Sequence, residues 1–309
     1  MPSLRDYRDR IKSVKSTKKI TAAMKMVAAS KLRRAEEQAE KSHPYALSMA
    51  SALARVTHNI VIDQDSSPLL KGTGSDDVHL LVVVTSDRGL CGGFNANILK
   101  ETRRRVLALK EAGKEVKIVC IGRKGYDSLR TDMKPLIIKH FFDITSQKRI
   151  QYSEAQAIRD YIVSEFDAGS FDVCTLVYSN FVSIMVQEPT AQQLIPFEMD
   201  DAIAQADTLN AVDENLQTTD GEPHAAPYEF EPDEESIVNT LLPRNIGVQL
   251  FRALLDSAAG EQAARMTAMD NATRNAGDVI KQVTLEYNRA RQAYITKELI
   301  EIISGAEAL

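Results

Sequence analysis

A glycine-rich segment carries the residues best placed for chemistry. Ser86–Asn95 follows the apolar run Val78–Thr85 and precedes an amphipathic stretch. A turn of this kind between a strand and a helix can present backbone N–H groups to a phosphate. A Walker loop, however, ends in Gly-Lys-Ser/Thr, whereas Gly93–Asn95 reads Gly-Phe-Asn, and the glycine spacing does not match GxGxxG. The pattern therefore favours a structural turn or partner-contact loop over a nucleotide site. Its residues of unassigned role are Asp87, Arg88, Gly89, Cys91 and Gly92.

Cysteine and histidine do not indicate a second site. The three cysteines are odd in number and widely spaced, without a CxxC pair, which is typical of a reducing compartment. Cys91 has no histidine within its motif, and none of the five histidines has a metal spacing such as HExxH. We therefore predict no catalytic residue, no metal and no cofactor.

Charge is distributed very unevenly along the chain. The net charge is −5, but residues 1–41 carry 12 basic and 5 acidic side chains, and residues 198–235 carry 13 acidic and no basic ones. A basic arm of this kind is compatible with nucleic acid, with a solvated helix face, or with acidic surfaces of protein partners. Nucleic-acid motifs and interleaved aromatic residues are missing, so partner contact ranks first and nucleic acid last.

Both ends of the chain have a heptad pattern. In the N-terminal 60 residues, small or apolar side chains recur in steps of three and four, which predicts a coiled-coil helix. At Lys18, Thr21 and Lys25 the pattern is interrupted, and we expect the apolar stripe to move to Ile20, Ala23, Met24 and Val27 there. Residues 236–309 repeat the rhythm, with Pro243 expected to kink or delay the helix. Two such helices at opposite ends of the sequence predict an antiparallel pair.

The middle of the chain has a different pattern. Val78–Thr85, Val116–Ile121 and Val173–Tyr178 are β-branched apolar runs, with weaker strand candidates at Pro135–Phe142 and Val182–Gln187. Amphipathic segments between them predict a Rossmann-like, largely parallel α/β domain. The predicted organisation is an N-terminal coiled-coil helix (1–60), an α/β domain (76–197), an acidic insert with a foot (198–235) and a C-terminal coiled-coil helix (236–309).

Composition excludes several classes of protein. Hydrophobic residues make up 44% and charged residues 26%, aromatic residues only 6%, and tryptophan is absent. The charged N-terminus lacks the apolar core of a signal peptide, and no apolar run approaches the ~20 residues that span a bilayer. We therefore exclude a secreted disulfide scaffold, an integral membrane protein, a collagen-like fibre and a disordered tail protein.

Three signatures occur in order along the chain. The first is Ile11–Leu32, which includes Ala23-Met24-Lys25-Met26-Val27-Ala28-Ala29-Ser30-Lys31. The second is Asp87–Gly93, and the third runs from Glu261 to Ala306 with Gln262-Ala263-Ala264-Arg265-Met266 and Tyr287-Asn288-Arg289-Ala290-Arg291-Gln292. With these signatures the chain resembles, over essentially its whole length, the gamma subunit of F-type ATP synthases of the bacterial type, the central rotor shaft.

The resemblance implies a non-catalytic subunit that couples proton flow to ATP synthesis. In the family, the coiled coil passes through a hexamer (3:3) of alpha and beta subunits, called the collar below. The globular part sits on the membrane c-ring beside the epsilon subunit, with one gamma chain per complex. The implied location is the cytoplasmic face of the bacterial inner membrane, without a nucleic-acid partner. Two alternatives are a nucleotide-binding enzyme and a coiled-coil scaffold for nucleic acid.

The resemblance also assigns positions. The implied collar contacts on the N-terminal helix are Lys18, Lys19, Met24 and Lys25. The positions that match residues which meet the collar or hold the two helices together are Glu261, Arg265, Arg274, Gln292, Thr296, Glu298 and Glu301. The implied bearing tip is Ile302, Ile303, Ala306 and Leu309. Phe230 and Glu231 match the Tyr-Glu-Pro segment that meets the c-ring and epsilon, with Phe in place of Tyr. The acidic insert has no cysteine pair, so thiol regulation is not expected.

Overall fold

The computed structural model describes residues 3–58, 67–145, 147, 149–197 and 234–307. The chain forms two compact units. We call residues 1–30 with 265–309 the helical unit, and residues 31–264 the sheet unit. The acidic insert and its foot, including Phe230 and Glu231, lie outside the described residues.

Two long helices run through both units. Helix α1 spans Leu4–His58 and helix α7 spans Glu234–Glu307. Their sequences are rich in alanine and in long charged residues, which have high helix propensity. The expectation that Pro243 delays the helix is wrong, because α7 begins at Glu234 and Pro243 lies inside it.

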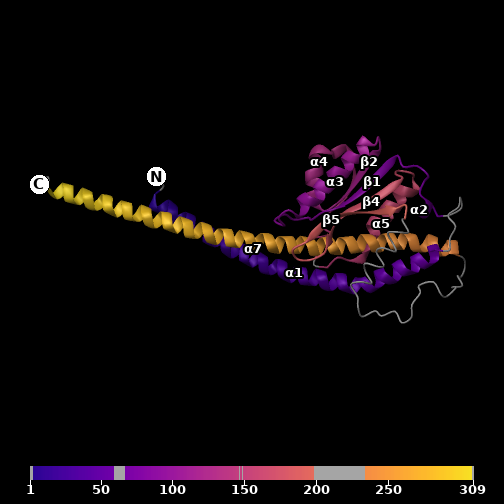
Figure 1. Cartoon of the computed structure of the whole chain (residues 1–309), viewed down its shortest axis with the longest axis horizontal. Coiled ribbons are helices and arrows are strands. Elements are labelled where there is room, and N and C mark those ends of the chain that lie inside the picture. Colours follow the sequence, from indigo (N-terminus) through magenta and orange to yellow (C-terminus); the bar gives the residue numbers. More distant parts are fainter. Residues whose placement is uncertain (1–2, 59–66, 146, 148, 198–233, 308–309) are drawn as a thin grey trace. The chain divides into compact units, whose positions relative to one another are not determined.

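Within the helical unit, α1 and α7 are antiparallel (Figure 1). Arg8 Nε donates a hydrogen bond of 3.0 Å to the Tyr287 hydroxyl, and Lys25 forms an ion pair of 2.6 Å with Asp270. Partner numbers on α7 fall as those on α1 rise, which is the signature of an antiparallel pair. The predicted coiled coil of the two chain ends is confirmed here.

The sheet unit contains a five-stranded sheet in the order β3-β2-β1-β4-β5. Its strands are β1 (Val78–Val84), β2 (Glu115–Ile121), β3 (Ile137–Phe141), β4 (Val173–Phe181) and β5 (Gln187–Ile195). β1 to β4 are parallel and β5 pairs antiparallel with β4. Six of the seven β1 residues are buried, as expected for a parallel strand covered on both faces. The predicted α/β class is confirmed.

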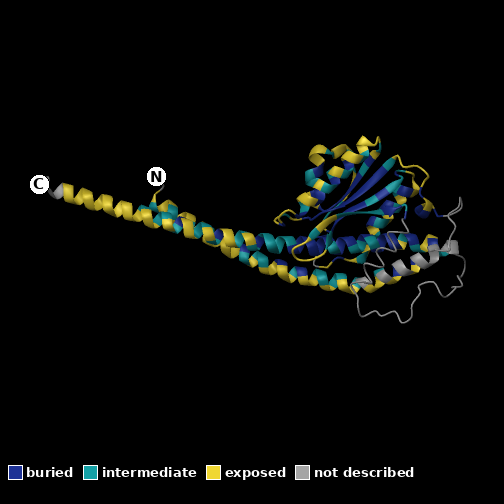
Figure 2. Ribbon diagram, in the orientation of Figure 1, coloured by how far each residue is buried: buried dark blue, intermediate teal, exposed yellow. Residues whose placement is uncertain are grey.

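Alternate side chains of β1 enter two hydrophobic cores. Leu81 and Val83 pack in a core with helix α3 (Phe94–Glu111) and helix α4 (Arg123–Asp132). Leu80, Val82 and Val84 belong to the core on the other face, with helix α5 (Tyr152–Asp167) and the Val238–Ala258 part of α7. Figure 2 shows the buried strands between these layers. The α7 helix therefore serves as one of the covering helices of the sheet.

Local differences from the sequence expectations occur at short elements. Helix α4, the short helix α2 (Pro68–Lys71) and the 3-10 turn η1 (Lys134–Leu136) were not anticipated. The prediction of a strand over Val182–Gln187 is wrong, because residues 182–186 connect β4 to β5 and the strand begins at Gln187. β-Branched residues alone do not distinguish a strand from an apolar turn.

A buried carboxylate on α7 makes the stability of the sheet unit depend on pH. Burial raises the pKa of Asp256 to about 6, although the Arg252 guanidinium lies 3.8 Å from its carboxylate. The burial of Tyr178 itself, together with the nearby negative charge of Asp256, raises the pKa of Tyr178 to about 12. Because the pKa in the folded protein lies above the ordinary aspartate value of 3.8, this carboxyl favours folding below pH 4, and that contribution is lost as the pH rises through about 6.

We therefore expect Asp256→Asn to be stabilising relative to wild type above pH 6 but not at pH 4. Urea unfolding of both proteins at each pH gives the difference between their free energies of unfolding. We predict that this difference changes by roughly 2–3 kcal/mol between the two pH values. Comparing the two proteins removes the contributions of all other carboxyls. A difference that stays constant from pH 4 to pH 7 would contradict the assignment.

Candidate functional site

Polar residues occupy the seam of the helical unit where the sequence pattern is interrupted. Thr21 is buried, and its hydroxyl accepts a 2.8 Å hydrogen bond from the hydroxyl of Thr273. One turn further, Lys25 pairs with Asp270, and Arg274 pairs with the same carboxylate. The hydrogen bond from Lys25 is the main reason that the pKa of Asp270 lies below its ordinary value, and Arg274 lowers it further. Polar side chains therefore take part in the seam where the heptad pattern is interrupted.

Three large apolar residues of this stretch are exposed. Ile20 is 57% exposed, Met26 68% and Val27 57%. Polar groups thus share the seam with the buried side chains of Ala28, Met269 and Ala276, while the large aliphatic side chains of Ile20, Met26 and Val27 are exposed to solvent. Clustered exposed apolar side chains mark interaction surfaces in soluble proteins. We call Ile20, Met26 and Val27 the apolar band.

The far end of α7 is a single exposed helix. All residues from 291 to 304 are exposed, including Tyr294, which the heptad pattern placed in the seam. The partner helix α1 begins at Leu4, and its residue Arg8 already pairs with Tyr287. The large apolar side chains exposed here are Tyr294, Ile295, Leu299, Ile300, Ile302 and Ile303.

The structure distributes the implied collar contacts over the surface of the helical unit. Lys18, Lys19 and Arg274 are exposed, while Met24, Lys25 and Arg265 are half-buried. Four further positions are exposed on the single helix, namely Gln292, Thr296, Glu298 and Glu301. Of the implied tip, Ile302 and Ile303 are 64% and 58% exposed. Leu309 lies outside the described residues, as does the side-chain environment of Ala306.

Glu261 has a different environment. It is only 3% exposed and belongs to the sheet unit, where its neighbour Gln262 is also buried. Its side chain therefore faces the interior of that unit, and the expectation of a collar contact at Glu261 is corrected. The resemblance implied the same role for Glu261 and Arg265, but only Arg265 belongs to the helical unit.

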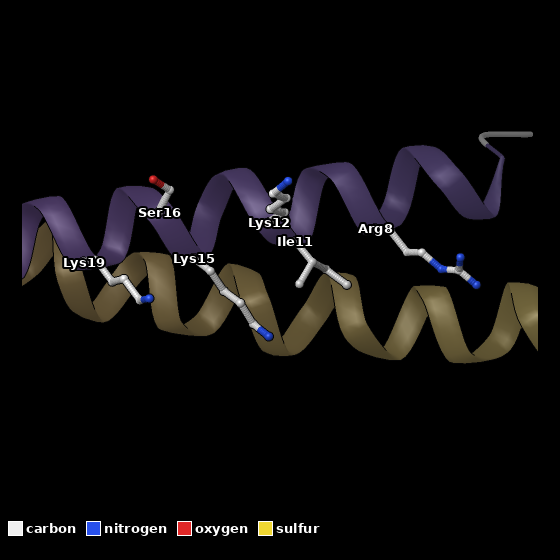
Figure 3. A pocket seen from close by; sticks show the side chains of 6 residues that line it. All are labelled: Arg8, Ile11, Lys12, Lys15, Ser16 and Lys19. Atoms are coloured by element: carbon white, nitrogen blue, oxygen red, sulfur yellow. The ribbon is translucent and has the colours of Figure 1, made fainter.

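A shallow basic groove runs along the N-terminal part of α1. Its lining residues, which Figure 3 shows beside α7, are Arg8, Ile11, Lys12, Lys15, Ser16 and Lys19. Four of the six are cations, and the ring of Tyr287 lies 5.6 Å from the Arg8 guanidinium carbon. The predicted basic arm thus presents a row of positive charges on the surface of the helical unit, suited to an acidic partner surface.

The glycine-rich loop after β1 is held by its own side chains. The Asp87 carboxylate accepts hydrogen bonds from the backbone N–H of Arg123 (3.1 Å) and of Asp143 (3.0 Å), and from the Thr145 hydroxyl (3.0 Å). It therefore joins the end of β1 to the starts of α4 and of the segment after β3. Asp87 is buried, while Arg88 is exposed and Gly89 is half-exposed.

Two backbone N–H groups of the loop are also hydrogen-bonded to nearby side chains. The Ser86 N–H donates to Asn95 Oδ1 (3.0 Å), and the Asp87 N–H donates to Thr145 Oγ1 (3.1 Å). Cys91 is 2% exposed and accepts from the Asn95 amide, and Gly92 takes a positive φ of 56°. The N–H groups of Ser86 and Asp87 are thus already paired, which favours a structural turn.

Two further features of the described residues bear on chemistry. Among them, no group of three or more His, Cys, Asp or Glu side chains is arranged to hold a metal. No helix in the described part of the chain is both long and apolar enough to cross a membrane. The sequence reasoning missed Asp270, although its i,i+4 spacing to Arg274 was a readable signal of an ion pair.

Comparison with known proteins points to one family. A family model described as ATP synthase matches residues 3–309. The ATP synthase gamma chain of Allorhizobium ampelinum is 53% identical over 309 residues, and that of Sinorhizobium fredii is 52% identical. Both alignments cover all of this chain and all of the relative.

Solved structures show the same fold. A chain of the central stalk and c-ring structure of Tetrahymena thermophila mitochondrial ATP synthase matches with a TM-score of 0.57 and 25% identity, over 82% of this chain and 99% of the other. A rotor chain of the Euglena gracilis enzyme matches with a TM-score of 0.61 and 18% identity, over 94% and 98%. From the family model and the full-length relatives, the chain belongs to the ATP synthase gamma chain family.

Proposed function

We propose that this central-stalk gamma chain is the rotor of a proton-translocating ATP synthase and is not itself catalytic. Its helical unit turns inside a collar of alpha and beta subunits and drives their nucleotide sites through successive conformations. The sheet unit and the foot connect it to the c-ring and to an epsilon subunit. One copy serves each complex, at the cytoplasmic face of the bacterial inner membrane.

The apolar band and the exposed end of α7 carry this proposal. Helices in proteins owe most of their stability to the packing of an apolar face, yet the end of α7 leaves Ile295, Leu299 and Ile302 exposed. Such a segment gains stability from an enclosing partner. Aliphatic contacts are non-directional, so a helix that presents them can change its orientation within an apolar sleeve without breaking fixed hydrogen bonds.

Charge adds a second requirement for the partner. The positive charges of Lys12, Lys15 and Lys19 in the groove are complementary to acidic surfaces. The two cations of the seam, Lys25 and Arg274, are instead paired with Asp270. Electrostatic complementarity mainly sets orientation and the rate of association. Acidic loops of the collar would therefore be oriented by the basic groove, while the apolar residues supply the contact area.

The internal hydrogen bonds of the loop at Asp87 support a non-catalytic role. With the N–H groups of Ser86 and Asp87 committed to Asn95 and Thr145, this loop does not offer the phosphate cradle of a nucleotide enzyme. Nucleotide chemistry is assigned to the collar subunits.

The test attaches the helical unit covalently to the collar. Met26→Cys introduces an exposed thiol, whereas the three natural cysteines are buried and free. A benzophenone maleimide placed on this thiol in the assembled complex should, on irradiation, join the chain to a collar subunit. Multisite ATP hydrolysis should then fall in proportion to the cross-linked fraction, because the shaft can no longer turn.

The matched control is Leu107→Cys on α3, where the native side chain is 60% exposed. Its conjugate should leave hydrolysis unchanged because α3 lies in the sheet unit, outside the proposed collar. Full hydrolysis by complexes that carry the Met26 cross-link would refute the rotor role.

A further inference from the structure

The ion pair between Lys25 and Asp270 joins the two helices of the helical unit. The Lys25 ammonium donates to Asp270 Oδ1 across 2.6 Å, and the other oxygen, Oδ2, accepts from Arg274 one turn further along α7. The Asp270 side chain is 22% exposed, whereas that of Lys25 is 44% exposed and that of Arg274 is 73% exposed. Each carboxylate oxygen therefore binds one cation, and one of the two cations belongs to the other helix.

The cations of the basic groove have a different environment. Lys12, Lys15 and Lys19, which Figure 3 shows along α1, are exposed, and none of them pairs with a carboxylate of the described residues. They follow one another in steps of three and four residues, at which like charges on a helix repel. The helical unit thus leaves the groove cations available to an acidic partner, while it neutralises Lys25 internally.

Lys25 lies in the segment of α1 that carries the apolar band. It directly precedes Met26 and Val27, whose side chains are 68% and 57% exposed. A free ammonium in this segment would stand among exposed aliphatic side chains. Because an unpaired ammonium is costly to remove from water, an apolar partner surface fits this segment best when the charge of Lys25 is already neutralised.

Association of the two helices does not by itself explain the ion pair. The seam beside it is packed by the buried side chains of Ala28, Met269 and Ala276, and Thr21 and Thr273 are joined by a hydrogen bond. Partly exposed ion pairs contribute little to stability, because water and salt screen them. Charges have a larger effect on which surfaces meet, since a free charge in the wrong place favours an unwanted contact.

Rotation would expose every face of the shaft to the same partner surface. Under the proposed function, an acidic loop of the collar meets successive faces of the helical unit as the shaft turns. Lys19 and Lys25 are six residues apart in α1, which is about 9 Å along the helix axis. A free Lys25 would therefore offer a second ion pair to a loop that faces Lys19.

We propose that Asp270 is a specificity-determining residue of the rotor. By pairing with Lys25, it confines the acidic loops of the collar to the basic groove and keeps them off the segment that carries the apolar band. The inference rests on the proposed function and deepens it, because it names the residue that keeps the two contact surfaces distinct. Asp270 acts through Lys25 and is itself a positioning residue.

The first test maps which lysines touch the collar in the assembled complex. A carbodiimide joins a lysine amine directly to a carboxylate in contact with it, and peptide mapping identifies both partners. The wild-type complex should give links from Lys15 or Lys19 to a collar subunit, and an internal link between Lys25 and Asp270. In the Asp270→Asn complex, Lys25 should form a new link to a collar subunit. If Lys25 does not link to the collar in this variant, or already does so in the wild type, the inference is overturned.

Asp278→Asn is the matched control. It also removes one negative charge from α7, but the partner of Asp278 is Lys281 on the same helix, 3.4 Å away, and the two side chains are 74% and 81% exposed. This variant should keep the internal link between Lys25 and Asp270. A link from Lys25 to the collar in the Asp278→Asn complex would show that net charge, rather than the pair across the seam, decides the contact, and would refute the inference.

The second test measures ATP hydrolysis by the assembled complex at several salt concentrations. Asp270→Asn should lower the rate about threefold at low salt, because the new ion pair must break as the shaft turns, and salt of about 0.3 M should remove most of this loss. Lys25→Gln/Asp270→Asn has no free lysine and should hydrolyse ATP at the wild-type rate. A loss that is equal at all salt concentrations, or that the second substitution does not remove, would indicate a structural role alone and contradict the inference.

The two proposals fail in distinguishable ways. If Met26→Cys cross-links to the collar and Lys25 of the Asp270→Asn variant does not, the inference about Asp270 is wrong and the rotor function stands. If Met26→Cys, Lys15 and Lys19 all fail to link to the collar, both are wrong.

Discussion

Replacing Gly122 by alanine is expected to destabilise the sheet unit by about 4 kcal/mol. Gly122 adopts φ +94°, and a Cβ there would overlap the carbonyl oxygen of Thr85 and lie 2.9 Å from its hydroxyl oxygen. Backbone strain and steric overlap therefore add. Both residues follow adjacent central strands, β1 and β2, so relief of the overlap would disturb the sheet itself.

Gly113→Ala provides the matched control. Gly113 has a similar φ of +77°, but nothing lies within 4 Å of a Cβ built there. This variant should lose only about 1 kcal/mol, from backbone strain alone. Urea unfolding can be followed by the exposure of the thiols of Cys120 and Cys174, which are fully buried in β2 and β4 in the folded protein. Equal losses in the two variants would show that the contact with Thr85 does not matter.

Replacing Asp87 by alanine should cost about 3 kcal/mol. The substitution leaves the N–H groups of Arg123 and Asp143 and the hydroxyl of Thr145 without their acceptor. All three lie where α4 and the segment after β3 meet the end of β1. We expect a lower urea midpoint for thiol exposure, and faster amide hydrogen exchange at Arg123 and Asp143.

Asp87→Asn separates hydrogen bonding from charge. Its amide oxygen can still accept from the two N–H groups, and its NH₂ can donate to Thr145 Oγ1, so the loss should be about 1 kcal/mol. If the asparagine variant were as unstable as the alanine variant, the carboxylate charge rather than the acceptor geometry would be the important property. A fully stable alanine variant would refute the structural role of the loop.

Much of the fold was predictable because its signals are local. The heptad steps of α1 and α7 and the apolar run of β1 depend on residues within a few positions of one another. The short element α4 has no comparable signal, because Gly125 interrupts a polar segment of only ten residues. The Val182–Val186 segment has strand-like composition, yet its place in a turn depends on the pairing of β5 with β4.

The candidate site was predictable only in part. The three signatures identified the family, but the environments of the matched positions depend on tertiary packing. Lys25 looks like a surface cation in the sequence, whereas Asp270, 245 positions away, makes it a seam residue. The resemblance places Glu261 among the residues that meet the collar or hold the helices together, whereas packing within the sheet unit buries it.

The sequence by itself thus determined the element types, the mixed α/β class and the family, since periodicity, propensity and motif order are written along the chain. Tertiary structure alone decided which side chains hold the molecule together and which remain available. Thr21 and Lys25 entered the seam because Thr273 and Asp270 came opposite them, and this left Ile20, Met26 and Val27 exposed. Hydrogen bonds and ion pairs need partners in specific positions, and only folding brings such distant residues into contact.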